Sequence, residues 1–289
     1  MKRLVLILLL FGMDIQLESV GVNRLSDNRI DYTVEDRQIF DRFVQAMDGK
    51  KHLAFGELII ETAKFFMETP YVTSTLEKEP EHLVINLREF DCTTLVENVI
   101  ALTHTVKGTT PSFETFCAEL QQLRYREKAI NNYTDRLHYF TDWIFENSLK
   151  HLVRDETKAI GGQSYRLNLS YMSTHPDSYR QLKSNPALIP VIAQKEKEIS
   201  DRDIYAFIPE VQIEDCRASM KNGDIVCFIT QIEGLDVSHV GFIYWQGEKL
   251  GFLHASSTAK KVIVDPLSLY DYVKSIRSAI GVMIVRPIY

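Results

Sequence analysis

A thiol and an imidazole are the two side chains of this sequence best suited to covalent hydrolysis of an amide. Cys92 stands directly after Asp91, and His239 lies 147 residues further along the chain, in Ser238-His239-Val240-Gly241. A thiol becomes a strong nucleophile when a neighbouring imidazole takes its proton. Cys92 is therefore the candidate nucleophile and His239 its candidate base.

Cys92 is expected to open a helix. Asp91 has the side chain of a good N-cap, and apolar residues follow Cys92 at helical spacing, namely Leu95, Val96, Val99 and Leu102. The free amides and the dipole of a helix N-terminus favour thiolate over thiol, and the same amides can hold an oxyanion. The pattern predicts an activated thiol, with a small core residue as the open alternative.

A second histidine is placed to orient the first. His254 follows His239 by 15 residues, on a segment expected to pair with the His239 strand. Gly241 shares a strand face with His239 and would let another backbone approach closely. A polar partner on the adjacent strand can fix the tautomer of a catalytic imidazole. His254 is the candidate partner, although each histidine could also be an ordinary strand residue.

Helical and extended patterns follow one another along the chain. Helical spacing covers residues 33–47, about 53–67 and much of 111–200, and a short extended run covers 83–87. From Tyr205 onward the pattern is strand-like, and turn signals such as Asn222-Gly223 and Gln246-Gly247 favour antiparallel hairpins. Helices followed by an antiparallel sheet predict an α+β fold.

The N-terminus resembles an export signal. Lys2 and Arg3 precede the apolar run 4–13, which is shorter than the roughly 20 residues of a membrane span. We expect residues 1–17 to be a signal peptide, with an uncleaved anchor as the alternative, and the protein to be exported, to the periplasm. Residues 18–289 are then one domain, with 111–204 as a helical elaboration.

Charge and cysteine spacing exclude some functions. The net charge is -6, and the 33 Lys and Arg residues are scattered rather than massed, which argues against nucleic acid as a partner. The other cysteines, Cys117, Cys216 and Cys227, show no metal-binding spacing, although the four could form two disulfides. Neither a metal nor another cofactor is expected.

Several motifs resemble one superfamily. Phe90-Asp91-Cys92-Thr93, Gly223-Asp224-Ile225-Val226 and Ser238-His239-Val240-Gly241 resemble motifs of the NlpC-type papain-like cell-wall hydrolases. The strings at 137–144 and 172–177 are similar to its N-acetylmuramoyl-L-alanine amidase-like branch, and the resemblance runs from about residue 36 to the C-terminus. It implies a papain-like core, in which the nucleophile-bearing helix packs on the antiparallel sheet.

The resemblance also implies roles for individual residues. Cys92, His239 and His254 match a Cys-His-His triad, and Tyr71 matches a tyrosine whose hydroxyl helps to bind the oxyanion. Thr73-Ser74 replaces the glycine pair that often follows this tyrosine. Candidate substrate-binding residues are Arg136, His138, Tyr139, Asp142, Trp143, His175 and Ser238. A helix cap, a core aromatic or an internal hydrogen bond is the alternative for these.

The implied reaction is hydrolysis of the amide between N-acetylmuramic acid and L-alanine, in peptidoglycan or soluble muropeptides. One alternative is a γ-D-glutamyl-diamino acid endopeptidase with the same cysteine chemistry. Another is a non-catalytic cell-wall-binding module. A zinc amidase is disfavoured because the histidines lack recognisable ligand spacing.

Overall fold

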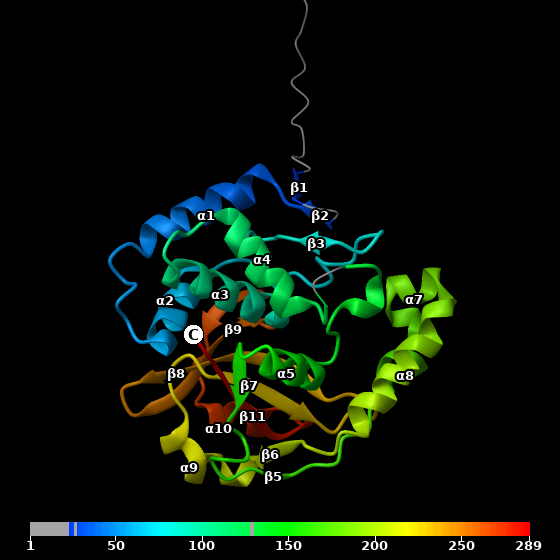
Figure 1. The fold of residues 1–289 in the computed structure, drawn as a ribbon. Coiled ribbons are helices and arrows are strands. Elements are labelled where there is room, and N and C mark those ends of the chain that lie inside the picture. Colours follow the sequence, from blue (N-terminus) through cyan, green and yellow to red (C-terminus); the bar gives the residue numbers. More distant parts are fainter. Residues whose placement is uncertain (1–22, 26–27, 128–129) are drawn as a thin grey trace, which may run out of the picture.

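An antiparallel sheet forms the centre of the molecule (Figure 1). The computed structural model describes residues 23–25, 28–127 and 130–289, so the predicted signal peptide lies outside the described residues. In this part of the chain the sheet has eight strands in the order β10-β9-β8-β7-β11-β6-β5, and β4 pairs with β11. The strands are β4 (Val153–Asp155), β5 (Gln163–Ser164), β6 (Ala206–Pro209), β7 (Ile225–Thr230), β8 (Val237–Gln246), β9 (Lys249–Ser256), β10 (Lys261–Val264) and β11 (Ala279–Pro287).

Five helices cover one face of this sheet (Figure 1). The central one, α3, is buried along most of its length, with Leu95, Val96 and Val99 fully buried, as expected for a helix between the sheet and other helices. It packs with α2 and α4 and against β8. The five helices are α1 (Val34–Ala46), α2 (Phe55–Phe65), α3 (Cys92–Lys107), α4 (Phe113–Arg124) and α5 (Phe140–Leu149).

The opposite face of the sheet is covered by short helices. Alternate residues of β7 and β8 point to this face, among them Val226, Phe228 and Ile243. They pack with α9 (Ile213–Cys216) and α10 (Leu269–Ser275). Each of these strands is therefore buried on both faces, which explains why β7 is a continuous apolar run.

A third apolar cluster joins the helices α6 (Tyr171–Thr174), α7 (Arg180–Ser184) and α8 (Ile189–Ser200) to the segment before α5. These helices lie within 111–204, the range predicted as a helical elaboration. The same range supplies β4 and β5 to the main sheet. That residues 111–204 are an elaboration of one domain stays a prediction.

A second, smaller sheet has three strands. It consists of β1 (Asn23–Leu25), β2 (Asn28–Asp31) and β3 (Leu83–Val84), in the order β1-β2-β3. β1 and β2 pair in antiparallel fashion, whereas β2 and β3 are parallel.

The predicted mixture of helices and an antiparallel sheet is confirmed. The helices expected near 33–47 and 53–67 are α1 and α2, and the strand-like segments after Tyr205 are β6 to β11. In the described part of the chain no helix is both long and apolar enough to cross a membrane. The papain-like assignment of the core stays a prediction.

Candidate active site

Cys92 is the first residue of α3, as the sequence predicts. The Asp91 carboxylate accepts a hydrogen bond from the Thr94 amide at 2.8 Å, and the Thr94 hydroxyl accepts one from the Asp91 amide at 2.9 Å. This reciprocal capping box satisfies two amides at the helix start. It fixes the point at which the backbone enters α3, and with it the position of the thiol.

Cys92 and His239 line the same cavity, which has a volume of about 150 Å³. Its walls come from the start of α3, the segment before and into α5, α6 and the loop after α6, and the start of β8. The lining residues are Cys92, Thr93, His138, Tyr139, Phe140, Met172, Tyr179, Leu235, Asp236, Val237, Ser238, His239 and Val240. The topology thus brings the two candidate reactive side chains, 147 residues apart, to one small space.

The two histidines form a hydrogen-bonded pair that continues to a carboxylate. Nε2 of His239 lies 2.6 Å from Nδ1 of His254, and Nε2 of His254 lies 3.1 Å from Oδ2 of Asp265. His254 is 1% exposed and Asp265 6% exposed. Because Nε2 of His239 is engaged, its Nδ1 is the nitrogen left for a proton from another group.

Gly241 makes room for this pair. A Cβ at this position would lie 2.8 Å from the backbone oxygen of Leu253 and 3.0 Å from the Cβ of His254. Only a residue without a side chain lets β9 come close enough for the His254 ring to reach His239. The predicted close approach at Gly241 is confirmed, and the approaching backbone is that of β9.

Both imidazoles are neutral near physiological pH. Burial lowers the pKa of His239 to about 4. Burial, together with the neighbouring His239, lowers the pKa of His254 to about 3. The pair can therefore accept a proton but carries no positive charge at rest.

The thiol of Cys92 is less acidic than the helix-start argument predicts. Burial, followed by the negative charge of Asp91, raises its pKa to about 12. Hydrogen bonds from the Val240 amide and from Thr93 oppose this rise and are outweighed. The greater acidity expected of a thiol at a helix start is therefore not found in this structure, because burial outweighs the groups that favour the thiolate.

Cys92 and His239 share the cavity without a hydrogen bond between them. The groups that favour its thiolate are instead the backbone of Val240 and Thr93. Catalytic hydrogen bonds are often long or misaligned before substrate binds. Tyr71 lies near the thiol, since its pKa is raised to about 12 by burial, Cys92 and Asp91, and its backbone is bridged to Phe90.

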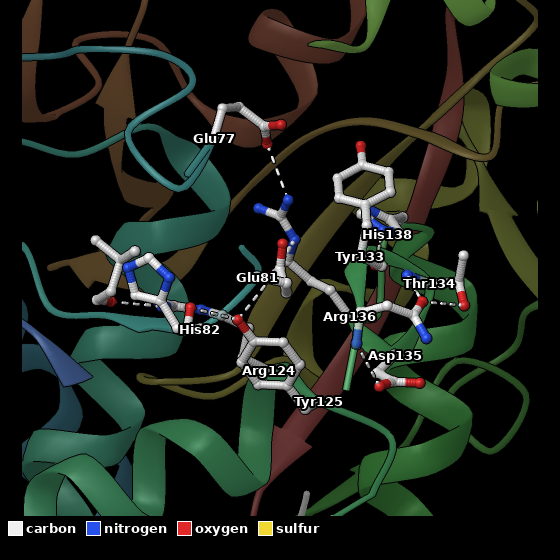
Figure 2. Close-up of polar contacts among 12 residues, drawn as sticks. Glu77, Glu81, His82, Arg124, Tyr125, Tyr133, Thr134, Asp135, Arg136 and His138 are labelled. Carbon is white, nitrogen blue, oxygen red and sulfur yellow. Dashed lines mark hydrogen bonds and ion pairs between the residues drawn. The ribbon is translucent and has the colours of Figure 1, made fainter. Parts of the chain in front are cut away.

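A second, larger cavity of about 560 Å³ shares Thr93, His138 and Tyr179 with the first. Arg136 lines it and is 7% exposed. Figure 2 shows its guanidinium directed toward Glu77 and Glu81, at 3.1 and 3.3 Å. The carboxylates that pair with Arg136 in this structure are thus the protein's own.

His138 lines both cavities. Its Nε2 donates a hydrogen bond to the carbonyl of Tyr133 at 2.8 Å (Figure 2), because a carbonyl oxygen can only accept. Burial, then the charge of Arg136, lowers the pKa of His138 to about 3. The ring is therefore neutral, and its Nδ1 has a lone pair.

The other predicted substrate-binding residues divide between cavity and core. Tyr139 lines the first cavity, and its hydroxyl donates to Glu196 at 2.6 Å. Ser238 lines the same cavity and is exposed. Trp143 is fully buried and stacks on Phe140 at 4.8 Å.

Asp142 and His175 do not line either cavity. Asp142 is buried and pairs with Arg126 and, at 2.8 Å, with Arg202. His175 is exposed and stacks on Tyr171. The structure therefore does not bring these two residues, or Trp143, to the space around Cys92.

Asp265 is the residue at this site that sequence reasoning missed. It follows β10 directly, and β10 pairs with β9 so that Ile263 lies opposite His254. A carboxylate just beyond a strand that neighbours a histidine-bearing strand was the available signal. Recognising it required the order of β9 and β10 in the sheet.

Comparisons with known proteins show the family and the fold. Residues 61–282 match the family described as AmiA-like, N-acetylmuramoyl-L-alanine amidase-like. A solved N-acetylmuramoyl-L-alanine amidase from Bacteroides uniformis is 36% identical, with a TM-score of 0.78 over 81% of this chain and 99% of that chain. A structure from Bacteroides fragilis, provisionally named a xylanase, is 38% identical, with a TM-score of 0.74 over 78% of this chain and 99% of that chain.

A Legionella pneumophila protein that is 22% identical, with a TM-score of 0.66 over 88% of this chain and 96% of that chain, shares the fold. No curated protein matches. The matches define a hydrolase of the cell-wall amidase class. The chain belongs to the AmiA-like, N-acetylmuramoyl-L-alanine amidase-like family.

Proposed function

We propose that this protein is a cysteine-dependent amidase that cleaves the bond between the lactyl group of N-acetylmuramic acid and L-alanine. The observation that carries the proposal is the shared cavity of Cys92 and His239, with His239 held by His254 at 2.6 Å. The names of the family and of the Bacteroides uniformis structure support the choice of bond. The motifs at Cys92 and His239 support placing the chain in the NlpC-type papain-like superfamily.

The first half of the proposed reaction forms a thioester. The Cys92 side chain turns from the Val240 amide toward His239, whose Nδ1 takes the thiol proton as sulfur attacks the lactyl carbonyl. The Cys92 amide, which has no acceptor within its own helix, and the Tyr71 hydroxyl stabilise the oxyanion. The carbon–nitrogen bond then breaks, and His239 returns the proton to the departing amine of L-alanine.

The second half uses water. His239 takes a proton from a water molecule, whose oxygen attacks the thioester carbonyl, and the carbon–sulfur bond breaks. The proton returns to Cys92, and the sugar acid leaves as a carboxylic acid that ionises in solution. His239 serves as base and then acid in each half, which suits a group that is neutral at rest.

The cavity residues supply the substrate-binding surface in this proposal. His138 offers an acceptor nitrogen between the two cavities, and Tyr139 and Ser238 line the smaller one. Arg136 lines the larger cavity and forms part of its substrate-binding wall. Peptidoglycan lies outside the cytoplasm, so the proposal includes export, in line with the apolar N-terminal run.

The products identify the bond. We expect incubation with a defined muropeptide, followed by mass analysis, to yield a free peptide that begins with L-alanine, together with the sugar acid. A γ-D-glutamyl endopeptidase would instead leave L-alanine and D-glutamate on the sugar, and a binding module would leave the substrate intact. Either of these two results would contradict the proposal.

A further inference from the structure

Asp265 contacts the nitrogen of His254 that does not face His239. It lines neither of the two cavities at the site, and its backbone amide donates to the carbonyl of Phe252 at 3.0 Å. Its Oδ1 accepts a hydrogen bond from the Leu267 amide at 2.9 Å, while Oδ2 faces Nε2 of His254. One backbone bond therefore holds the main chain of Asp265 on β9, and a second holds its carboxylate, whose other oxygen is directed at one imidazole nitrogen.

The surroundings of His254 leave it few other partners. The rings of Phe252 and Tyr272 lie 4.5 and 5.7 Å from the His254 ring, centroid to centroid, and His254 is 1% exposed. Its two nitrogens are thus committed to His239 on one side and Asp265 on the other. Burial of the imidazole keeps it neutral, so one of these nitrogens carries a hydrogen and the other does not.

We propose that Asp265 is a positioning residue that fixes the tautomers of both histidines and so leaves Nδ1 of His239 free of hydrogen. Burial raises the pKa of Asp265, while the hydrogen bond from the Leu267 amide and the charge of Lys249 oppose that rise. Once ionised, Asp265 can only accept, so Nε2 of His254 carries the hydrogen and Nδ1 has the lone pair. Nε2 of His239 then donates to that lone pair. The inference rests on the proposed function, because it supplies the base which that reaction needs.

The reversed arrangement has the opposite consequence. If a group at position 265 donates to His254, Nδ1 of His254 carries the hydrogen and donates to Nε2 of His239. Nδ1 of His239 then carries its own hydrogen and cannot take one from Cys92. The direction of the hydrogen bond between residue 265 and His254 therefore decides whether His239 can act as the base.

Asp265→Asn tests this logic with almost no change in shape. The Leu267 amide would hold the carboxamide oxygen, which turns the carboxamide nitrogen toward His254 as a donor. We expect kcat for muropeptide cleavage to fall by up to about 10⁴-fold, the loss seen when a catalytic histidine is forced into the wrong tautomer, with KM changed less than about twofold. Asp271→Asn, an exposed carboxylate of α10, is the matched control and should keep the wild-type rate.

Nitrogen-15 NMR of the full chain, labelled at histidine, shows which ring nitrogen carries the hydrogen. A purely structural role for Asp265 would leave these tautomers unchanged. We expect hydrogen on Nε2 of both His239 and His254 in the wild type and in Asp265→Glu, and on Nδ1 of both in Asp265→Asn. Substitution of each histidine by Gln assigns the signals.

A wild-type His254 that carries hydrogen on Nδ1, or an Asp265→Asn variant with wild-type tautomers and rate, would overturn the inference. The tautomers are measured without substrate, so they test the role of Asp265 even if the proposed reaction is wrong. If Asp265→Asn does not fold, the wild-type and Asp265→Glu spectra still show which nitrogen of His254 carries the hydrogen, and so still test the inference.

Discussion

The rings of His239 and His254 meet nearly at right angles, at 83°, with Nε2 of one 2.6 Å from Nδ1 of the other. The N–H bond and the nitrogen lone pair each lie in the plane of their own ring, and the 2.6 Å separation is that of a short hydrogen bond. The bond holds the His239 ring with its Nδ1 edge turned away from His254. The relationship depends on the close approach of β8 and β9.

Gly241→Ala should separate the two histidines. The added Cβ would lie 2.8 Å from the Leu253 oxygen, so β9 must move. We expect the free energy of unfolding to fall by about 1–3 kcal/mol, as for overpacked cores, and the turnover number to fall with it. Chemical denaturation and a muropeptide assay measure the two effects.

Gly251→Ala is the matched control on β9. There the nearest atom to an added Cβ, the Tyr244 oxygen, lies at 3.3 Å, which a slight shift accommodates. If Gly241→Ala and Gly251→Ala lose stability and turnover equally, the role assigned to Gly241 is wrong.

The reactivity of Cys92 in the free protein should follow pH as that of an unactivated thiol. With the pKa of Cys92 raised to about 12 and that of His239 lowered to about 4, the alkylation rate should rise about tenfold per pH unit from pH 6 to 9. A resting thiolate–imidazolium pair would give a plateau over that range instead. Mass spectrometry of iodoacetamide adducts, in a Cys216→Ala background, gives the rate at Cys92.

Asp91→Asn should accelerate that alkylation at each pH. Asn keeps the helix cap but removes the negative charge that raises the pKa of Cys92. An unchanged or slower rate in this variant would show that Asp91 does not oppose the thiolate. Circular dichroism confirms that α3 still forms.

The ion pairs of Arg136 should matter for stability as well as for substrate. Arg136→Ala would leave Glu81, which is buried, without its cation, and we expect the free energy of unfolding to fall by about 3–5 kcal/mol. Arg180→Ala, at an exposed residue that lines the same cavity, should change it by less than about 0.5 kcal/mol. Equal losses in urea denaturation would contradict a structural role for Arg136.

Local features of the site could be predicted from the sequence because local interactions create them. Asp91 caps α3 through the residue three positions on, and the spacing of β8 and β9 brings His254 to His239. These depend on helix capping and strand pairing between neighbours in the chain. The position of Cys92 at a helix start follows from the same rules.

Features that depend on distant packing could not be predicted. Trp143 lies in the string 137–144, which resembles a family motif, but it stacks in the core, because the string does not show which of its side chains face a cavity. Asp142 pairs with Arg202, 60 residues away. The acidity of Cys92 depends on how deeply the folded chain buries it, and burial outweighs the Val240 and Thr93 groups that favour the thiolate.

Release of free L-alanyl peptide from a muropeptide by wild type, Cys92→Ala and Cys216→Ala tests the central claim most directly. Cys216 is a partly exposed thiol that lines neither cavity at the site, and its substitution should leave the rate unchanged. We predict that Cys92→Ala, while folded, releases no peptide above the uncatalysed background. Peptide release by Cys92→Ala at the wild-type rate would contradict the assignment of Cys92 as the nucleophile.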